Sequence, residues 1–298
     1  MCVTVIPYGM LKRRFAKLRE QFALPLPETP ETAAERIPVN ELGPDDHLIL
    51  FATSQAFSAD HRDVRCRVSI LLREPPSIQR RYYRFLRYFG GRYHRILTHN
   101  SWMLQHCPNA VFVPHGGSSL ERPFPSDCTK DRLVSLIASR KRTTQGQALR
   151  HRIADWAIQS KLDLNRYGYA YQPLENKADG HSRYMFSVVI ENCREPGYFS
   201  EKLIDSLLCQ SIPIYWGAPD VSHFFDPRGL IICRTEADIR SAVANATEAE
   251  FARRLPFLLE NRKRALQYAD WTRPIPEIFR SEELGRSAAH PTPLRIAA

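Results

Sequence analysis

The sequence predicts an α/β protein built from two Rossmann-like domains. Short apolar segments, typical of buried strands, alternate with amphipathic helical segments along most of the chain, which indicates parallel, doubly wound sheets. The length of 298 residues fits two domains of about 100–150 residues each. The clearest unit, residues 184–234, contains a strand, a glycine-containing turn, a helix and a second strand.

The first domain is expected to span residues 1–125 and to alternate strands with helices. Strands are predicted at 2–6, 47–53, 64–72, 95–98 and 110–113. Helices are predicted at 11–22 and 78–89, with a helical turn at 102–106. Residues 24–44 are rich in Pro, Glu and Thr and predict a loop.

The second domain is expected to span residues 126–280, after a linker at 122–131 that contains two prolines. Its predicted strands are 133–138, 185–190, 212–216 and 230–233. Its predicted helices are 147–159, one that begins at 199 or 200, 239–244 and 250–268. The polar tail at 281–298 is expected to be disordered.

Composition narrows the class of partner. Lys and Arg outnumber Asp and Glu by 42 to 32, a formal net charge of +10, which suits a nucleotide sugar, a nucleic acid or an anionic membrane surface. The seven cysteines include no CxxC pair, so we expect neither a zinc site nor a disulfide framework, and a reducing compartment. The first apolar run is too short for a signal peptide or a membrane helix. We therefore expect a soluble cytoplasmic protein, and peripheral membrane contact stays open.

A phosphate site is predicted where the strand at 185–190 leads into the next helix. A helix N-terminus offers unpaired N–H groups and partial positive charge, which together suit phosphate. Lys202 adds a full positive charge, and the carboxylate of Glu201 can accept hydrogen bonds from ribose hydroxyls. The pattern alone also fits a Glu201 that complements the helix dipole and a solvated Lys202.

Three blocks of this region occur in a fixed order. They are Glu191-Asn192, the segment GYFSEKL at 197–203 and the segment IPIYWG at 212–217. Together they resemble the donor-binding signature of glycosyltransferase family 10, the α-1,3/1,4-fucosyltransferases. The resemblance implies the GT-B arrangement, in which two Rossmann-like domains face a cleft, and a bacterial enzyme without the membrane anchor of Golgi members.

The blocks depart from the family pattern at three places. Phe199 replaces Val, Ser200 replaces Thr, and Gln210-Ser211 stands where a Gly is usual. A serine can still cap the helix. The resemblance implies donor contacts from Glu191, Asn192, Tyr198, Glu201, Lys202 and Gly217.

Glu74 is the candidate catalytic base. It follows the strand predicted at 64–72, and the carboxyl ends of parallel strands present side chains to ligands. Pro75 and Pro76 stiffen the backbone that follows. The family has a Glu-x-Pro element here, and the resemblance implies that its Glu is the general base. From the residues alone, a solvated or salt-bridged Glu beside Arg73 is the commoner outcome.

The basic segment 139–152 is the candidate binding segment for a diphosphate. The family pattern, a Ser followed about ten residues later by an Arg near a helix start, is matched best by Ser139 and Arg150. An Arg can bind phosphate in a bidentate manner while staying charged. Lys141, Arg142 and Arg152 stay open as alternatives to Arg150.

The histidines indicate no metal site. His94, His99, His106 and His115 do not have the spacing of a known metal motif, and no DxD motif of the metal-binding type is present. His115 occupies the family's Pro-Tyr-Gly element as Pro-His-Gly. It could line the cleft, although a histidine in such a loop more often bonds the backbone.

These observations together predict a metal-independent, inverting glycosyltransferase with no cofactor. Arg150, Lys202 and the helix N-terminus would stabilise the leaving diphosphate, and Glu74 would accept the proton of the attacking hydroxyl. The resemblance implies GDP-fucose as donor and a glycan as acceptor. The alternatives are a transferase for another GDP-sugar, a non-catalytic nucleotide-binding protein, and a nucleic-acid-binding protein. No RNA-binding or helix-turn-helix signature accompanies the basic residues, so no nucleic-acid partner is expected.

Overall fold

The computed structural model describes residues 1–11, 22–26, 37–59, 64–126 and 128–285. The chain forms two compact units. Unit 1 contains residues 1–115 and the returning segment from Trp271 onward, and unit 2 contains residues 116–270. The predicted domains differ from these units in two places. The predicted boundary was 125/126, whereas unit 1 ends at residue 115, and residues 271–280 were assigned to the second domain, whereas they belong to unit 1.

Unit 1 is built on a seven-stranded sheet with the order β3-β2-β1-β4-β5-β6-β7. The strands are β1 (Val3–Val5), β2 (Phe22–Pro25), β3 (Ile37–Pro38), β4 (His47–Phe51), β5 (Arg67–Leu72), β6 (Ile96–Thr98) and β7 (Ala110–Phe112). β1 and β4 to β7 are parallel, whereas β2 and β3 extend one edge in antiparallel fashion. The helices are α1 (Ser54–Ser58), α2 (Pro76–Phe89), α3 (Ser101–His106) and α8 (Pro274–Glu283), with 3-10 turns η2 (Val39–Glu41) and η3 (Gly90–Arg92).

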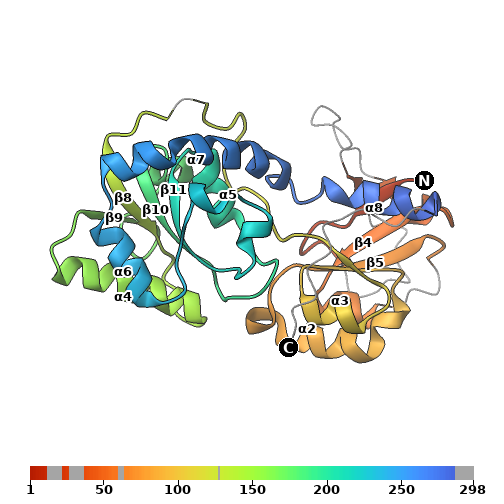
Figure 1. The fold of residues 1–298 in the computed structure, drawn as a ribbon. Helices are drawn as coiled ribbons and strands as arrows, with labels where there is room; N and C mark the ends of the chain where they lie inside the picture. Colours follow the sequence, from red (N-terminus) through yellow and green to blue (C-terminus); the bar gives the residue numbers. More distant parts are fainter. Residues whose placement is uncertain (12–21, 27–36, 60–63, 127, 286–298) are drawn as a thin grey trace. The chain divides into compact units, whose positions relative to one another are not determined.

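Alternation along the central strands gives this sheet two apolar faces, since successive strand residues point to opposite sides. Leu48 and Leu50 of β4 belong to the cluster that includes residues of α2 and α3. Ile49 belongs to the opposite cluster, which contains Ile278 and Phe279 of α8. Helices therefore cover both faces of the sheet (Figure 1).

Unit 2 is built on a five-stranded parallel sheet with the order β12-β11-β10-β8-β9. The strands are β8 (Arg132–Ile137), β9 (Leu164–Tyr167), β10 (Tyr184–Ile190), β11 (Ile212–Trp216) and β12 (Ile231–Ile232). The helices are α4 (Gln145–Gln159), α5 (Glu201–Leu208), α6 (Glu236–Ala244) and α7 (Glu248–Tyr268), with 3-10 turns η4 (Lys177–Gly180), η5 (Val221–His223) and η6 (Pro227–Gly229).

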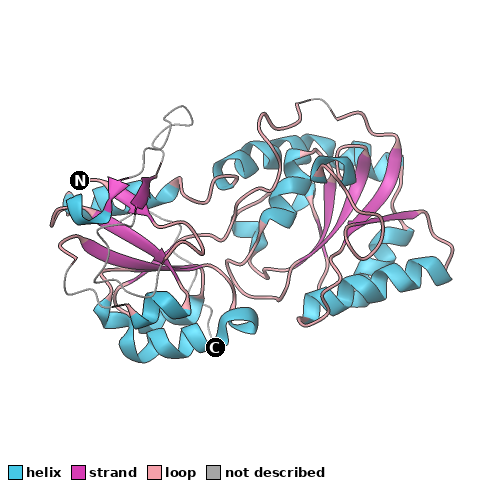
Figure 2. Ribbon diagram, turned by 180° about the vertical axis from the view of Figure 1, so that it is seen from behind, coloured by secondary structure: helices cyan, strands magenta, loops and turns pink. Residues whose placement is uncertain are grey.

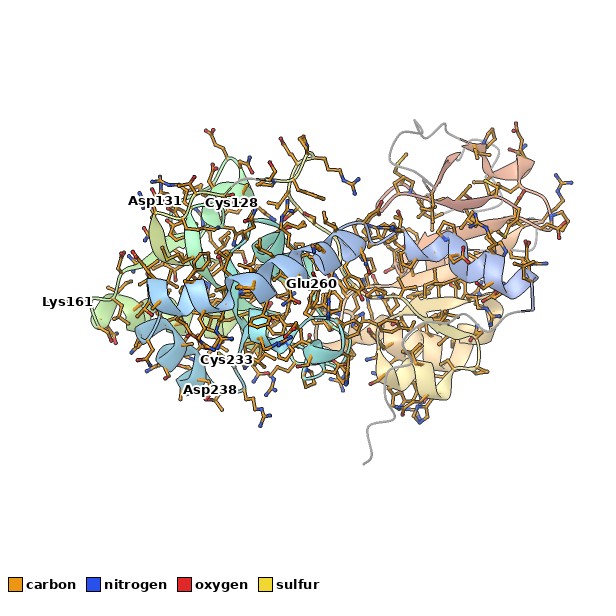
Figure 3. The ribbon with its side chains drawn as sticks, turned by 45° about the horizontal axis from the view of Figure 1, so that its top comes forward. Cys128, Asp131, Lys161, Cys233, Asp238 and Glu260 are labelled. Carbon is orange, nitrogen blue, oxygen red and sulfur yellow. The ribbon has the colours of Figure 1, made fainter. Side chains whose placement is uncertain are left out.

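The helices of unit 2 form a layer on each face of the sheet. α5 packs with α7, and α4 packs with α6 on the opposite face (Figures 1 and 2). Asp131, labelled in Figure 3, immediately precedes β8 and so marks the amino ends of the parallel strands. The opposite, carboxyl ends are where ligands bind in open α/β sheets.

Most predicted elements of both units are confirmed within a few residues. Five helices and strands were not predicted: α1, α8, β2, β3 and β9. The loop predicted at 24–44 is therefore wrong at β3 and at the end of β2. The helix predicted at 11–22 lies almost entirely outside the described residues, and its last residue, Phe22, begins β2 instead. Residues 281–283 of the expected disordered tail are helical, because they complete α8, and residues 286–298 lie outside the described part.

Candidate functional site

A cavity of about 540 Å³ lies at the carboxyl ends of three neighbouring strands of unit 2. Its lining includes Ser139 after β8, Gly168 after β9 and Asn192 after β10. The first turns of α4 and α5 and the loop at 173–177 supply other parts of the wall. A volume of this size suits a drug-sized ligand, for which pockets of roughly 300–1,000 Å³ are usual.

The N-terminus of α5 is shaped by two residues that bond each other. Ser200 is the N-cap, and its side chain accepts a hydrogen bond from the backbone N–H of Lys202. The carboxylate of Glu191, which is completely buried, accepts from the Ser200 backbone N–H at 2.8 Å and from the Ser200 hydroxyl at 2.6 Å. Glu191 therefore fixes the start of α5 against the carboxyl end of β10.

Lys202 brings positive charge into the cavity. Its Nζ lies 2.8 Å from Oε1 of Glu201, 3.0 Å from Oγ of Ser200 and 3.8 Å from Oε2 of Glu191. Burial acts to lower the pKa of Lys202, but the carboxylates of Glu201 and Glu191 outweigh it and hold that pKa above its ordinary value. The ammonium is thus charged, and its side chain keeps 28% of its surface exposed where it lines the cavity.

Arg150 lines the same cavity from α4. Its Nε donates to the backbone oxygen of Ile190 at 2.8 Å, and its Nη2 donates to Oδ1 of Asn192 at 3.1 Å. Burial lowers the pKa of Arg150, and the charges of Glu191 and Glu201 act against that shift. Because a guanidinium stays protonated in proteins, Arg150 is a buried cation held at the carboxyl end of β10.

The four basic residues that are candidates for binding the diphosphate differ in their position relative to the cavity. Among Lys141, Arg142, Arg150 and Arg152, all of them described, only Lys141 and Arg150 line the cavity. Arg152 instead pairs with Glu236, with Nε to Oε2 at 2.8 Å. Ser139 lines the cavity as well.

Three residues predicted to contact the donor do not line the cavity. Glu191 and Tyr198 are buried, and the Tyr198 hydroxyl accepts from Nδ2 of Asn192 at 3.3 Å. A Cβ at Gly217 would lie 2.3 Å from Oη of Tyr215 and 2.7 Å from Cγ of Glu191. These three residues shape and pack the turn beneath the cavity, and their contact with a donor stays a prediction.

An unpredicted network joins the start of unit 2 to α5. Asp205 lies one turn after Glu201, lines the cavity and accepts from the Ser118 hydroxyl at 2.7 Å and from the Ser119 backbone N–H at 3.1 Å. The Ser119 hydroxyl also donates to Asp205 and accepts from Nζ of Lys177 at 2.9 Å. Burial raises the pKa of Asp205, and the hydrogen bonds from both serines oppose that rise. Only the i, i+4 spacing from Glu201 signals Asp205 in the sequence.

Glu74 lies at the carboxyl edge of the sheet in unit 1, two residues after β5, as predicted. Its side chain is 39% exposed, and Oε1 lies 3.9 Å from Nε2 of His115, which follows β7. Arg73 donates from Nη2 to the backbone oxygen of His115 at 2.8 Å. The ring of His115 therefore faces the candidate base.

The described residues contain neither a metal-binding group nor a membrane-spanning helix. Within ranges 1–11, 22–26, 37–59, 64–126 and 128–285, no three His, Cys, Asp or Glu side chains are grouped as a metal site requires. None of the helices in those ranges has the length and apolar character needed to cross a membrane.

Comparison with known sequences identifies the family. The model described as glycosyltransferase family 10 (fucosyltransferase), C-terminal part, matches residues 128–287. The α-(1,3)-fucosyltransferase FucT of Helicobacter pylori is 39% identical over 67 residues, 22% of this chain and 13% of that protein. A putative fucosyltransferase-like protein of Arabidopsis thaliana is 30% identical over 70 residues, 22% of this chain and 14% of that protein. The chain thus matches only a small part of these relatives' length.

Comparison with solved structures identifies the fold. The structure of an α1,3-fucosyltransferase with GDP superposes with a TM-score of 0.51 at 17% identity, covering 85% of this chain and 78% of that one. TarM superposes with a TM-score of 0.56 at 9% identity, covering 89% and 63%. Both comparisons show the GT-B fold. Since the family model matches more than half of the residues, and its segment contains the capped helix and cavity described above, the chain belongs to glycosyltransferase family 10, the fucosyltransferase family.

Proposed function

We propose that the protein transfers L-fucose from GDP-fucose to a glycan hydroxyl, in an α-1,3 or α-1,4 linkage, with inversion and without a metal ion. The observation that carries this proposal is the cavity of unit 2, where Lys202, Arg150 and the N-terminus of α5 gather positive charge. A solved fucosyltransferase with the same fold contains GDP.

The diphosphate of the donor would bind to these cations. As the bond to the sugar breaks, the leaving diphosphate gains negative charge, and preorganised cations stabilise it without further rearrangement. Lys202 and the N–H groups at the start of α5 provide such charge, and Arg150 adds a second full cation from α4. Protein cations can thus take the part that a divalent metal plays in other transferases.

The ribose would be recognised by Glu201. Its carboxylate lines the cavity next to Lys202, and it can accept hydrogen bonds from vicinal hydroxyls. Nζ of Lys202 lies 2.8 Å from Oε1 of this carboxylate, so the cation and the hydroxyl acceptor are neighbours in the cavity wall. A nucleoside diphosphate requires this combination of cations and a hydroxyl acceptor.

Glu74 would act as general base toward the acceptor hydroxyl. It lies at a ligand-binding strand end, is partly exposed and has a second titratable side chain, His115, beside it. A single displacement by the deprotonated hydroxyl inverts the anomeric centre, so a β-linked donor gives an α-linked product. General base catalysis is worth about 100- to 10,000-fold in rate.

The test is Glu74→Gln, compared with the exposed Glu260→Gln of α7 as a matched control (Figure 3). Transfer from GDP-fucose to lactose or N-acetyllactosamine should fall by about 100-fold or more in Glu74→Gln, with GDP affinity unchanged. The control should match the wild type in both measurements. Full transfer activity in Glu74→Gln would exclude it as the base, and wild-type protein that leaves GDP-fucose intact would oppose the proposal itself.

The identity of the sugar is tested by a separate measurement, because the residues assigned above bind the diphosphate, the ribose and the acceptor hydroxyl. A thermal-shift panel of GDP-, UDP- and CDP-sugars distinguishes another donor, since the bound donor stabilises the fold by mass action. Salt-sensitive oligonucleotide binding that GDP does not affect would instead favour a nucleic-acid-binding protein.

A further inference from the structure

The outer side of α2 carries a stripe of arginines. Arg80, Arg84 and Arg87 have the i, i+4, i+7 spacing of one helical face, and all three are exposed. The inner side of α2 packs into the core of unit 1 through the buried Tyr83 and Leu86. α3 lies beside α2 on the same face of the sheet (Figure 1). The stripe therefore points away from the core of unit 1.

No carboxylate neutralises these arginines. Residues 75–120 contain six arginines and neither Asp nor Glu, so this segment accounts for more than half of the net charge of +10. Among the described residues, none forms an ion pair with Arg80, Arg84 or Arg87. The exposed Arg253 of α7, by contrast, pairs with Glu250. Such an uncompensated cluster of charge suits an anionic partner.

Two large aromatic side chains lie next to the stripe. Tyr88 of α2 is 72% exposed, and Trp102 of α3 is 38% exposed. Arg87 connects them, because its guanidinium lies 5.6 Å from the ring centroid of Tyr88 and 5.2 Å from that of Trp102. Arg80, Arg84, Arg87, Tyr88 and Trp102 thus form one exposed surface, the basic aromatic face.

The chemistry of this face matches the surface of a lipid bilayer. Tyr and Trp concentrate at the membrane–water interface, where the apolar ring and the polar edge both find partners. An arginine can lay its apolar stem among the headgroups while its guanidinium binds a phosphate. A single-stranded nucleic acid instead requires a groove that follows the strand, whereas these side chains project from the outside of two helices.

We propose that the basic aromatic face binds the surface of a membrane that contains anionic lipids. Its three arginines attract the anionic headgroups, each contributing about fivefold in affinity. The rings of Tyr88 and Trp102 enter the membrane–water interface beside them. This inference does not rest on the proposed transferase function, because binding to vesicles requires neither donor nor acceptor.

The first test is sedimentation of the full chain with lipid vesicles. Mixed vesicles of phosphatidylcholine and phosphatidylglycerol in equal parts should bind the protein, and vesicles of phosphatidylcholine alone should bind it at least about tenfold more weakly. The arginine variant combines Arg80→Gln, Arg84→Gln and Arg87→Gln. It should bind the mixed vesicles about 100-fold more weakly than the wild type, since three contributions of about fivefold are lost.

The matched control combines Lys161→Gln, Arg234→Gln and Lys263→Gln, which remove the same charge from exposed positions of unit 2. It should bind the mixed vesicles like the wild type. Equal affinities of the arginine variant and the wild type for these vesicles would overturn the inference. Wild-type protein that binds a generic oligonucleotide but not the mixed vesicles would also overturn it, because the face would then serve a nucleic acid.

The second test locates the contact. Phosphatidylglycerol with brominated acyl chains quenches a tryptophan that enters the membrane interface. Mixed vesicles made with this lipid should quench the tryptophan fluorescence of the wild type, and Trp102→Phe should remove most of that quenching. Trp156→Phe, which changes a half-buried residue of α4, should leave the quenching in place. Quenching that persists in Trp102→Phe would place the contact elsewhere and overturn the inference.

Discussion

Three buried histidines should make the protein sensitive to mild acid. Burial lowers the pKa of His47, His99 and His181 to about 3 in each case. Neighbouring basic side chains lower these pKa values further: His94 and Arg67 act on His47, Arg73 and His115 on His99, and Lys130 and Lys177 on His181. His47 also stacks on Phe279 of α8, with the ring centroids 4.0 Å apart.

The direction of the effect follows from linkage. These imidazoles stay neutral in the folded protein, whereas in the unfolded chain they take up a proton near pH 6.5. The unfolded state therefore binds more protons below that pH, and the free energy of unfolding falls from about pH 6.5 down toward pH 3. Ordinary carboxylates titrate below about pH 4.5, so the interval from pH 7 to pH 5 isolates the histidines.

The size of the effect can be worked out for each unit. pH 5 is about 1.5 units below the pKa that each histidine has in the unfolded chain. At 1.36 kcal/mol per unit, each histidine therefore lowers the free energy of unfolding by about 2 kcal/mol at this pH. His47 and His99 belong to unit 1 and His181 to unit 2. Unit 1 should thus lose at least about 4 kcal/mol, since burial also lowers the pKa of His94, and unit 2 about 2 kcal/mol. Both losses are large against typical stabilities of about 5–15 kcal/mol.

The assay is urea unfolding at several pH values with tryptophans that report on one unit at a time. Trp102 and Trp271 lie in unit 1, and Trp156 and Trp216 in unit 2. Phe replacements of either pair separate the two transitions, which need not coincide in a protein of two units.

The matched variants are His47→Gln and His106→Gln, the second changing an exposed residue. His47→Gln should reduce the loss in unit 1 at pH 5 by about 2 kcal/mol, whereas His106→Gln should leave it unchanged. A change of less than about 1 kcal/mol in unit 1 between about pH 7.5 and pH 5 would refute the reasoning.

Three further predictions concern the site in unit 2. Lys202→Ala should weaken GDP binding by about 10- to 100-fold in calorimetry, because it removes charge-assisted bonds of about 1.5–3 kcal/mol. Lys161→Ala, which changes an exposed residue, should leave the GDP affinity unchanged. Equal GDP affinities of Lys202→Ala and the wild type would contradict the proposed phosphate contact. Gly146→Ala would place a Cβ 1.6 Å from the backbone oxygen of Glu191, and we expect unit 2 to lose about 1–3 kcal/mol or more in thermal unfolding; an unshifted Tm would show that α4 moves freely. Asp205→Asn replaces a carboxylate that accepts bonds from two serines, and should lower urea stability by about 1–3 kcal/mol; wild-type stability would show that this network is dispensable.

The elements that the sequence left unpredicted have specific physical reasons. α8 contains Pro274 and Pro276, which favour a loop in a sequence window. In the structure Pro274 lies in the first turn, where a missing N–H costs nothing, and Ile275, Ile278 and Phe279 are buried against the sheet of unit 1. β9 reads Leu-Asn-Arg-Tyr, and its strand conformation is set by pairing with β8 at the sheet edge rather than by its own pattern.

The sequence by itself determined the features that depend on neighbours along the chain. The cap at Ser200, the charges of Glu201 and Lys202 and the strand before them are local, so periodicity and helix-end chemistry were enough to predict them. The tertiary structure alone decided which groups from distant segments meet. It buried Glu191 beneath α5 and brought His115 to Glu74, because parallel strands gather at one edge residues that are far apart in the chain.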